Sequence, residues 1–335
     1  MNSITRFMWT LAALTLVGAP LSCAGELAPS GKEIMDEWDG RNRLQDEIVE
    51  GMTEIHKKFK LMGKMRTFDQ KRRTTTWTLR YGKNNLATVL RYHSPEDLEN
   101  LSVLSYKDLK AYSKPYVVWQ WEPDNNLLRQ MSGPLSQTPK NNYFAVTDFT
   151  YEDLELEDLD SCVYRHVRDE KLKHAHDKKL SGTDCYVVEA YKKQGHKTGY
   201  AKRVLWISKD RYLTVRIDFY RTPKPKEVFK TLWAWDFKEV LPGIWRSDTI
   251  RMERQDRDCW TKMTTRTRRA NPGIPAWFFQ PNVLKITDEK GVALIEEMWS
   301  DYREIKKLEE EVEAARKELG ALRKKTGGAA AGGTP

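Results

Sequence analysis

Carboxylates with the potential for chemistry gather in one short stretch of the sequence. YFAVTDFTYED, from Tyr143 to Asp153, places three of them among four aromatic rings. Asp148, Glu152 and Asp153 belong to the residue types that act as general acids, bases or metal ligands. The structural alternative is a helix start, because a threonine followed three residues later by an acidic residue, here Thr150 and Asp153, can accept hydrogen bonds from free backbone N–H groups. We expect this second role, since charge clusters beside turns are mostly caps and solvated faces.

The histidines offer one pair with a metal-like spacing, His174 and His176, with Asp177 beside it. The surrounding stretch is rich in lysine and is more typical of an exposed hairpin or loop. No nucleophile elbow, phosphate loop or dinucleotide fingerprint occurs, and the cysteines lack zinc spacing. We therefore expect no enzyme activity, no cofactor and no metal. A hydrolase that uses Asp148 or His174 is the least favoured alternative.

Charge and composition narrow the class of protein. The chain of 335 residues has a formal net charge of +9, and a mean hydropathy of −0.71 excludes a polytopic membrane protein. Basic runs at 57–58, 71–73 and 265–269 could attract an anionic membrane surface, nucleic acid or an acidic protein. No nucleic-acid-binding motif is present, so we expect no nucleic-acid partner.

The first residues have the layout of a secretory signal peptide. Arg6 precedes an apolar run from Phe7 to about Val17, followed by small residues. The run is too short to span a bilayer, so we expect residues 1–24 to be removed and the protein to be exported. Ordinary cleavage fits better than lipoprotein processing, which makes lipid anchoring at Cys23 the less favoured alternative.

Three cysteines, Cys162, Cys185 and Cys259, then remain in a compartment that permits disulfides. One bridge plus one buried thiol is compatible with this odd number. The sequence does not indicate which pair would form the bridge.

The rest of the chain must position these groups, and it reads as one helix followed by hairpins. Ser30 can cap a helix that extends to about Val49, with an apolar face of Ile34, Trp38, Leu44 and Ile48. After Gly51 come β-rich runs such as TTTWTLRYG, YVVWQWE, DCYVVEAYKK and VLWISKDRYLTVRIDFY. Turn residues separate them, at Gly82–Asn85, Pro123–Asn126, Asp210-Arg211 and Pro242-Gly243. Hairpins without long intervening helices predict a curved antiparallel sheet.

Wide side chains alternate along these runs. Leu213, Val215, Ile217 and Phe219 are predicted to share one face of their strand, as are Phe229, Trp233, Trp235 and Phe237. Such rows form either an ordinary core or the wall of a cavity too large for side chains to fill. The pattern alone leaves both possibilities open.

The C-terminal part ends the sheet with the proline-rich NPGIPAWFFQPN. From Val292 to about Leu322, apolar residues recur in three- and four-residue steps, which predicts an amphipathic helix that packs on the domain or pairs with a partner. The final GGAAAGGTP has nothing to bury and should be disordered.

The order of several motifs is also informative. VLRYHSPEDLENLSVLSY, LLRQMSG, YFAVTDFTYEDLE, DCYVVEA, GYAKRVLWISKDRYLTVRIDFY and NPGIP follow one another. Together, over roughly residues 30–282, the chain resembles the LolA-like family of outer-membrane lipoprotein-sorting proteins, the branch associated with RND-type lipid exporters. The C-terminal helix and the charged region from Asp160 to Gly182 depart from that family's pattern.

The resemblance implies a mostly β (α+β) fold: a LolA/LolB-like half-open antiparallel β-barrel with helices plugging the cavity, plus a C-terminal amphipathic helix. The implied division is a signal peptide (1–24), a lipid-binding barrel domain (25–285), a heptad-like helix (286–325) and a disordered tail (326–335). Asp148, Phe149, Thr150, Tyr151 and Asp153 would frame or gate the barrel mouth.

The implied function is that of a periplasmic carrier of a lipid or an acylated lipoprotein, working towards the outer membrane with an RND-type exporter. The alternative is a non-enzymatic module that docks an exporter through its surface and C-terminal helix. The residues that we expect to line a lipid-binding cavity are Trp77, Leu79, Trp119, Trp121, Trp206, Leu213, Val215, Ile217, Phe219, Trp233 and Trp235.

Overall fold

A computed structural model of the chain describes residues 28–81, 85–108, 117–130, 144–150, 152–154, 159–194, 199–222, 227–287 and 289–327. The signal peptide predicted for residues 1–24, Cys23, Tyr151 and most of the predicted tail lie outside these ranges. Within them, no helix is both long and apolar enough to cross a membrane.

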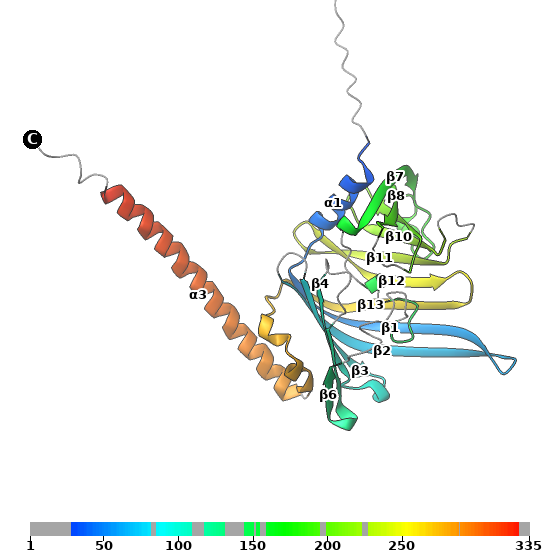
Figure 1. Cartoon of the computed structure of the whole chain (residues 1–335), viewed down its shortest axis with the longest axis horizontal. Coiled ribbons are helices and arrows are strands. Elements are labelled where there is room, and N and C mark those ends of the chain that lie inside the picture. Colours follow the sequence, from blue (N-terminus) through cyan, green and yellow to red (C-terminus); the bar gives the residue numbers. More distant parts are fainter. Residues whose placement is uncertain are drawn as a thin grey trace, which may run out of the picture.

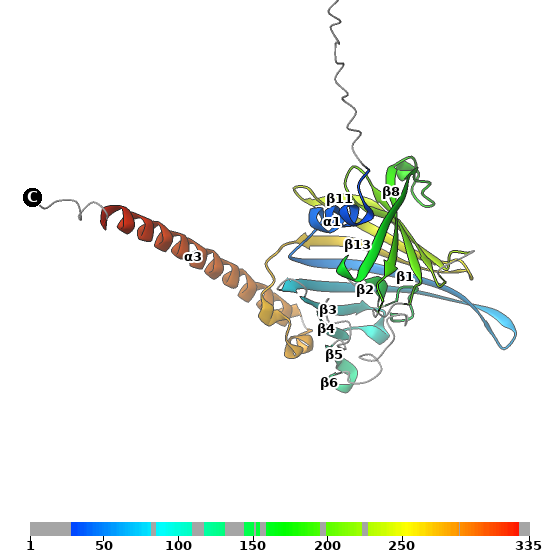
Figure 2. The ribbon, with the colours of Figure 1, turned by 45° about the horizontal axis from the view of Figure 1, so that its top comes forward.

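Within the described ranges, thirteen strands form a single antiparallel sheet, in the order β6-β5-β4-β3-β2-β1-β13-β12-β11-β10-β9-β8-β7. The strands are β1 (Asp46–Leu61), β2 (Lys64–Tyr81), β3 (Asn85–Ser94), β4 (Ser102–Asp108), β5 (Val117–Glu122), β6 (Leu127–Gln130), β7 (Cys162–Lys171), β8 (Asp184–Lys192), β9 (Lys202–Ser208), β10 (Thr214–Tyr220), β11 (Lys230–Leu241), β12 (Ile244–Arg254) and β13 (Cys259–Ala270). The edge strands β6 and β7 stand at opposite ends of this order, so the sheet curls without closing (Figure 1, Figure 2). The prediction of a half-open antiparallel sheet is confirmed.

The helices are few. In the part of the chain that the structure describes, two are α-helices, α1 (Gly31–Arg41) and α3 (Glu289–Gly327). Short 3-10 turns complete the described chain: η1 (Glu96–Leu98), η2 (Pro123–Asn125), η3 (Glu152–Leu154), η4 (Leu159–Ser161), η5 (Lys178–Leu180), η6 (Ala276–Phe278) and η7 (Pro281–Lys285). The expected turns at Pro123–Asn126, Asp210-Arg211 and Pro242-Gly243 each separate two neighbouring strands, whereas residues 82–84 lie outside the described ranges.

The helix predicted from Ser30 to Val49 is correct only in its first part. Ser30 and Glu33 form a reciprocal capping box at the start of α1, as the sequence predicts. The helix ends at Arg41, and the Asn42 carboxamide then accepts from the backbone N–H of Trp245. The residues from Asp46 onward belong to β1, because they pair with both β2 and β13. The extension to Val49 is therefore wrong.

The sheet has two covered faces. The inner face carries Thr76 and Thr78, and the outer face carries their sequence neighbours Trp77 and Leu79. At the β7 to β9 end, Ile34 of α1 packs on the inner face in a cluster of buried side chains that includes Met35, Val188, Leu205 and Ile207. The outer face of β2 to β5 is covered by η6, η7 and the first turns of α3, through Phe278, Phe279, Leu284, Ile295 and Trp299. The start of α3 is thus part of the domain core, although the sequence places a boundary near residue 286.

The cysteines do not form a bridge in the described chain. Cys162, Cys185 and Cys259 are all free and buried. Burial raises the pKa of the Cys185 thiol to about 12.

Candidate functional site

A cavity of about 790 Å³ lies against the inner face of the sheet. Most of its wall comes from β2 to β5, and the other side is formed by the end of α1 and by side chains near β10 to β13. This size lies within the range of about 300–1,000 Å³ that is typical of sites for small ligands.

The wall alternates hydroxyl and aliphatic groups. Its polar members include Thr74, Thr76, Thr78, Thr88, Ser105 and Gln120, and its apolar members include Leu86, Leu90, Val103, Val118, Phe144 and Leu213. Threonine is β-branched and suits a strand, and it presents a methyl group beside each hydroxyl. The wall can therefore contact a long apolar ligand while keeping its hydroxyls solvated or hydrogen-bonded.

One end of the cavity is closed by a segment that we call the strap, residues 144–150 and 152–154. Phe144, Ala145, Thr147 and Leu154 of the strap line the cavity. The Thr147 hydroxyl donates to the Phe144 carbonyl at 2.5 Å, and the Arg72 guanidinium donates to the Ala145 carbonyl at 2.6 Å. The strap is thus a folded part of the cavity wall, and Arg72 of β2 holds its backbone.

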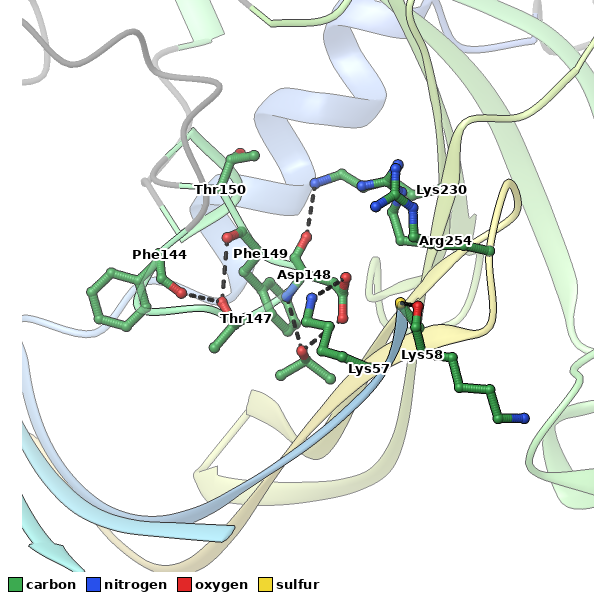
Figure 3. Close-up of polar contacts among 12 residues, drawn as sticks. Lys57, Lys58, Phe144, Thr147, Asp148, Phe149, Thr150, Lys230 and Arg254 are labelled. Carbon is green, nitrogen blue, oxygen red and sulfur yellow. Dashed lines mark hydrogen bonds and ion pairs between the residues drawn. The ribbon is translucent and has the colours of Figure 1, made fainter. Parts of the chain in front are cut away.

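Lysine side chains of the sheet hold the strap carboxylates Asp148 and Asp153, and Figure 3 shows the contacts of Asp148. Lys57 of β1 donates to Asp148 Oδ1 at 2.5 Å, and the Thr261 hydroxyl donates to Asp148 Oδ2 at 2.9 Å. Lys230 of β11, which is fully buried, donates to the Asp148 carbonyl at 3.2 Å and to Asp153 Oδ2 at 2.5 Å. Burial lowers the pKa of Lys230, while the nearby Asp153 charge raises it.

The expected capping arrangement also forms. The Thr150 backbone N–H donates to Asp153 Oδ2 at 2.6 Å, and the Asp153 backbone N–H lies 3.3 Å from the Thr150 hydroxyl as 3-10 turn η3 begins. Phe149 is fully buried against Tyr200, Phe219 and Met252. These contacts give Asp148, Phe149, Thr150 and Asp153 positions in a structural anchor between strap and sheet.

His174 is occupied by the fold on both ring nitrogens. Its Nδ1 accepts from the backbone N–H groups of His176 and Asp177 at 3.1 and 2.9 Å. Nε2 therefore carries the proton and donates to the Ala234 carbonyl at 3.2 Å. Burial lowers the pKa of this histidine. Among the described residues, no group of three or more histidine, cysteine or acidic side chains has a metal-binding arrangement.

The predicted cavity residues are placed differently by the structure. Of the eleven, Leu213 lines the cavity. Ile217 and Phe219 point to the inner face but are covered by neighbouring clusters. The remaining residues pack on the outer face: Trp77, Leu79, Trp119 and Trp121 beneath the C-terminal segment, and Trp206, Val215, Trp233 and Trp235 in a cluster with Leu172.

Two causes explain this difference. Alternation separates two faces without indicating which one is concave, and here the rings occupy the outer face. A β-bulge between Thr214 and Arg216 also changes the register of β10 with β9, so Val215 packs with Trp206 on the outer face while Ile217 faces inward. The threonines of the cavity wall, which we did not predict, can be recognised in the sequence. Thr74, Thr76 and Thr78 occupy the positions that alternate with the predicted Trp77 and Leu79.

Comparison with known proteins places the chain in a family. A family model described as "Uncharacterized protein" matches residues 84–286, which is more than half of the chain. The chain belongs to this family. A search of curated proteins gave no match.

Solved structures agree on the fold. A domain from Vibrio parahaemolyticus described as an outer membrane lipoprotein-sorting protein has 23% identity and a TM-score of 0.61, over 76% of this chain and 98% of that one. A DUF1329 family protein from Desulfovibrio piger has 24% identity and the same TM-score, over 76% and 97%. A LolA superfamily protein from Nitrosomonas europaea has 16% identity and a TM-score of 0.53, over 76% and 100%. The chain therefore has the LolA-like fold that its motifs predict.

Proposed function

We propose that the protein is a non-enzymatic carrier that holds a lipid, or the acyl chains of a lipoprotein, in the inner-face cavity. The observation that carries this proposal is the cavity of about 790 Å³, walled by threonine and aliphatic side chains. The fold is shared with a domain described as an outer membrane lipoprotein-sorting protein, which supports the same function here. Export to the periplasm, inferred from residues 1–24, would place the carrier between the two membranes.

The free energy of binding depends on the apolar surface area that the ligand withdraws from water. Withdrawing apolar surface from water contributes about 25 cal/mol per Å², so an acyl chain of a dozen methylenes gains on the order of 10 kcal/mol before entropic costs. A carrier must also release its cargo. The strap is the element that can regulate release, because Phe144 and Thr147 contact the cavity while Asp148 and Asp153 are tied to the sheet.

An anionic membrane surface is the partner that the β1–β2 hairpin would meet. Beyond Lys57 the hairpin no longer pairs with β13, and it projects past the sheet (Figure 1, Figure 2). Its tip exposes apolar side chains, with Met62 at 95% and Met65 at 65% of their full surface. Among the described residues, Lys60, Lys64 and Arg66 form no ion pair. An apolar hairpin tip flanked by basic side chains without ion pairs suits the interface of an anionic bilayer. Each basic residue near the membrane surface contributes about 1 kcal/mol to the binding free energy.

The sequence resemblance adds an RND-type exporter as a protein partner. The alternative function, a module that docks an exporter without carrying cargo, requires that the cavity be empty in the cell. The two are separated by what the purified protein contains.

The test is extraction of the natively purified protein with organic solvent, followed by mass spectrometry. A Thr76→Trp variant places a ring in the cavity, whereas Thr267→Trp adds the same ring at an exposed position of β13. We expect a near-stoichiometric lipid in the wild type and in Thr267→Trp, and a loss of most of it in Thr76→Trp. Both variants must unfold at a temperature close to that of the wild type. A lipid-free wild type that also takes up no added lipid would refute the carrier and favour the docking module.

A further inference from the structure

Two arginines at the α1 end of the cavity form no ion pair with an acidic side chain of the described residues. Arg80 near the end of β2 and Arg246 near the start of β12 both line the cavity. Burial is the largest cause and lowers the pKa of each guanidinium, the charge of Glu47 acts in the opposite direction on both, and the charges of Arg268 and Arg80 lower the pKa of Arg246. Two positive charges are therefore held near each other and partly withdrawn from water, which costs stability unless an anion joins them.

The nearby acids are already engaged. Glu47 accepts from Arg268 Nη1 at 3.2 Å, and Asp39 accepts from Arg43 Nη2 at 2.8 Å. Asp46 accepts from the backbone N–H groups of Gly273 and Ile274 at 3.3 and 2.6 Å. Arg80 and Arg246 form no ion pair with any described residue. The hydrogen bond recorded for their guanidinium groups runs from Arg246 Nη1 to the Trp245 carbonyl, at 3.0 Å.

Other buried arginines of the chain are treated differently. Arg216 forms a two-pronged pair with Asp218, and Arg254 does the same with Asp256. Arg72, in the same cavity, donates to Gln70 and to the Ala145 carbonyl. Arg91, which is buried and has no ion pair among the described residues, donates to the Ser102 hydroxyl at 3.1 Å. Among the described arginines that line the cavity, Arg80 and Arg246 thus differ from Arg72 in having no side chain as a hydrogen-bond partner.

We propose that Arg80 and Arg246 bind the acidic head group of the cargo, so that the ligand is an anionic amphiphile. Guanidinium groups bind carboxylates and phosphates through paired hydrogen bonds. The apolar body would then lie along Leu86, Leu90 and Val118 towards the strap. This inference rests on the proposed carrier function, and it adds the charge and orientation of the ligand.

The test compares a fluorescent polyene fatty acid with its methyl ester, which has the same chain without the charge. We expect the wild type to bind the acid about 10-fold more tightly than the ester. In an Arg80→Gln/Arg246→Gln variant this preference should disappear while binding of the ester remains. Arg266→Gln, at an exposed site on β13, serves as the control and should keep the preference. The double variant should also unfold at the same or a higher temperature, because it removes two desolvated charges.

The outcomes separate the two proposals. Equal binding of acid and ester by the wild type, or a preference that survives in the double variant, overturns the head-group site and leaves the carrier standing. No binding of either probe overturns both. Displacement of the fatty acid by phosphatidic acid, but not by diacylglycerol, would assign the site to a lipid phosphate. Displacement by inorganic phosphate alone would mean that the site binds an anion without a lipid body, and it would overturn the proposal.

The C-terminal helix carries an independent second inference. α3 leaves the domain after Arg303, whose guanidinium donates to the Pro272 carbonyl at 3.1 Å, and extends away from the sheet (Figure 1, Figure 2). Every residue from Arg303 to Ala321 is exposed. A helix that stands alone in water is marginally stable, because most helical stability in proteins comes from packing of an apolar face.

The exposed apolar residues follow a heptad. The a positions are Met298, Ile305, Val312 and Leu319, and the d positions are Leu294, Asp301, Leu308 and Ala315. Apart from Asp301 and the small Ala315, these are large apolar side chains at least half exposed, including Ile305 at 55% and Val312 at 51%. Ile295 and Trp299, which pack on the domain, occupy other heptad positions. The domain therefore leaves the row of a and d side chains uncovered, and we call this row the seam.

We infer that a second copy of the chain covers the seam as a parallel two-stranded coiled coil. β-Branched residues at a with leucine at d favour two parallel strands. The g positions Glu297, Glu304, Glu311 and Glu318 are all acidic, so an antiparallel pair would oppose two rows of glutamate. In a parallel pair one such contact, Glu304 with Glu309, is still between like charges, but the heptad spacing matches Glu311 and Glu318 with the e-position residues Arg316 and Arg323 of the other copy. Among the described residues Arg316 has no ion pair.

Sedimentation of the whole chain over a concentration series tests this inference. We expect a reversible dimer whose dissociation constant rises about 100-fold in Leu308→Glu, since the seam is buried only between copies. Glu310→Gln, at an outer heptad position, is the control. Arg316→Glu should weaken the dimer about 10-fold, and the swap Glu311→Arg/Arg316→Glu should restore it. A monomer at all concentrations, a dimer insensitive to Leu308→Glu, or oxidised Leu319→Cys chains that do not cross-link would overturn the parallel coiled coil.

Discussion

The anchor between strap and sheet predicts a large loss of stability when Lys230 is replaced by methionine. The ammonium group is fully buried, and it donates to the Asp148 carbonyl at 3.2 Å and to Asp153 Oδ2 at 2.5 Å. Its removal leaves the buried Asp153 carboxylate with the Thr150 backbone N–H and the Tyr200 hydroxyl as its remaining donors. Breaking one half of a buried pair costs about 3–5 kcal/mol.

The assay is urea unfolding followed by tryptophan fluorescence, with a double-mutant cycle. Asp153→Asn alone should also destabilise, because it leaves the Lys230 charge buried. The double variant Lys230→Met/Asp153→Asn should lose less than the sum of the single losses, by about 1–3 kcal/mol. Lys171→Met is the control, because its ion pair with Asp184 is exposed and should contribute less than about 1 kcal/mol.

Two results would refute this reasoning. A Lys230→Met variant within about 1 kcal/mol of the wild type would mean that the buried pair does not anchor the strap. A double variant whose loss equals the sum would mean that Lys230 and Asp153 act independently. If the prediction holds, the single variant should also release bound lipid faster, because Phe144 and Thr147 of the strap line the cavity.

The remaining predictions concern pH, thiols and membranes. Burial lowers the pKa of His174 below the ordinary 6.5, so the unfolded chain binds a proton more readily than the folded one. The free energy of unfolding should therefore fall as the pH drops below 6.5, by up to about 1.4 kcal/mol per pH unit. A His174→Gln variant should reduce this slope in unfolding experiments. Cys185, with its raised pKa, should react with iodoacetamide at neutral pH only after denaturation, and rapid labelling of the native chain would contradict its burial. Phe59→Ser/Met62→Ser should lower co-sedimentation with phosphatidylglycerol vesicles while leaving lipid uptake from detergent unchanged; equal sedimentation of variant and wild type would exclude the hairpin tip as the membrane contact.

Much of the fold could be predicted from local chemistry. Alternating side chains and turn residues at Pro123–Asn126 and Pro242-Gly243 identify hairpins, because turns of this kind force neighbouring strands to run antiparallel. β1 and β7 were missed, since DEIVEGMTEIHKKFKL and CVYRHVRDEK are rich in charge and only partly alternate. Pairing with other strands stabilises both: β7 pairs with β8, and β1 pairs with β13, which is distant in the sequence. Local patterns do not contain that information.

The cavity could not be read from the positions of the large rings, and the structure gives a physical reason. Rings fill space, so a face that carries Trp77 and Trp121 becomes a packed core once Phe278 and Trp299 cover it. Threonines on the opposite, inner face of a curved sheet are too short to reach across the space they enclose. The alternation Thr76-Trp77-Thr78 therefore has two structural consequences. Trp77 contributes to a packed outer layer, and Thr76 and Thr78 form an inner surface that leaves room for a ligand.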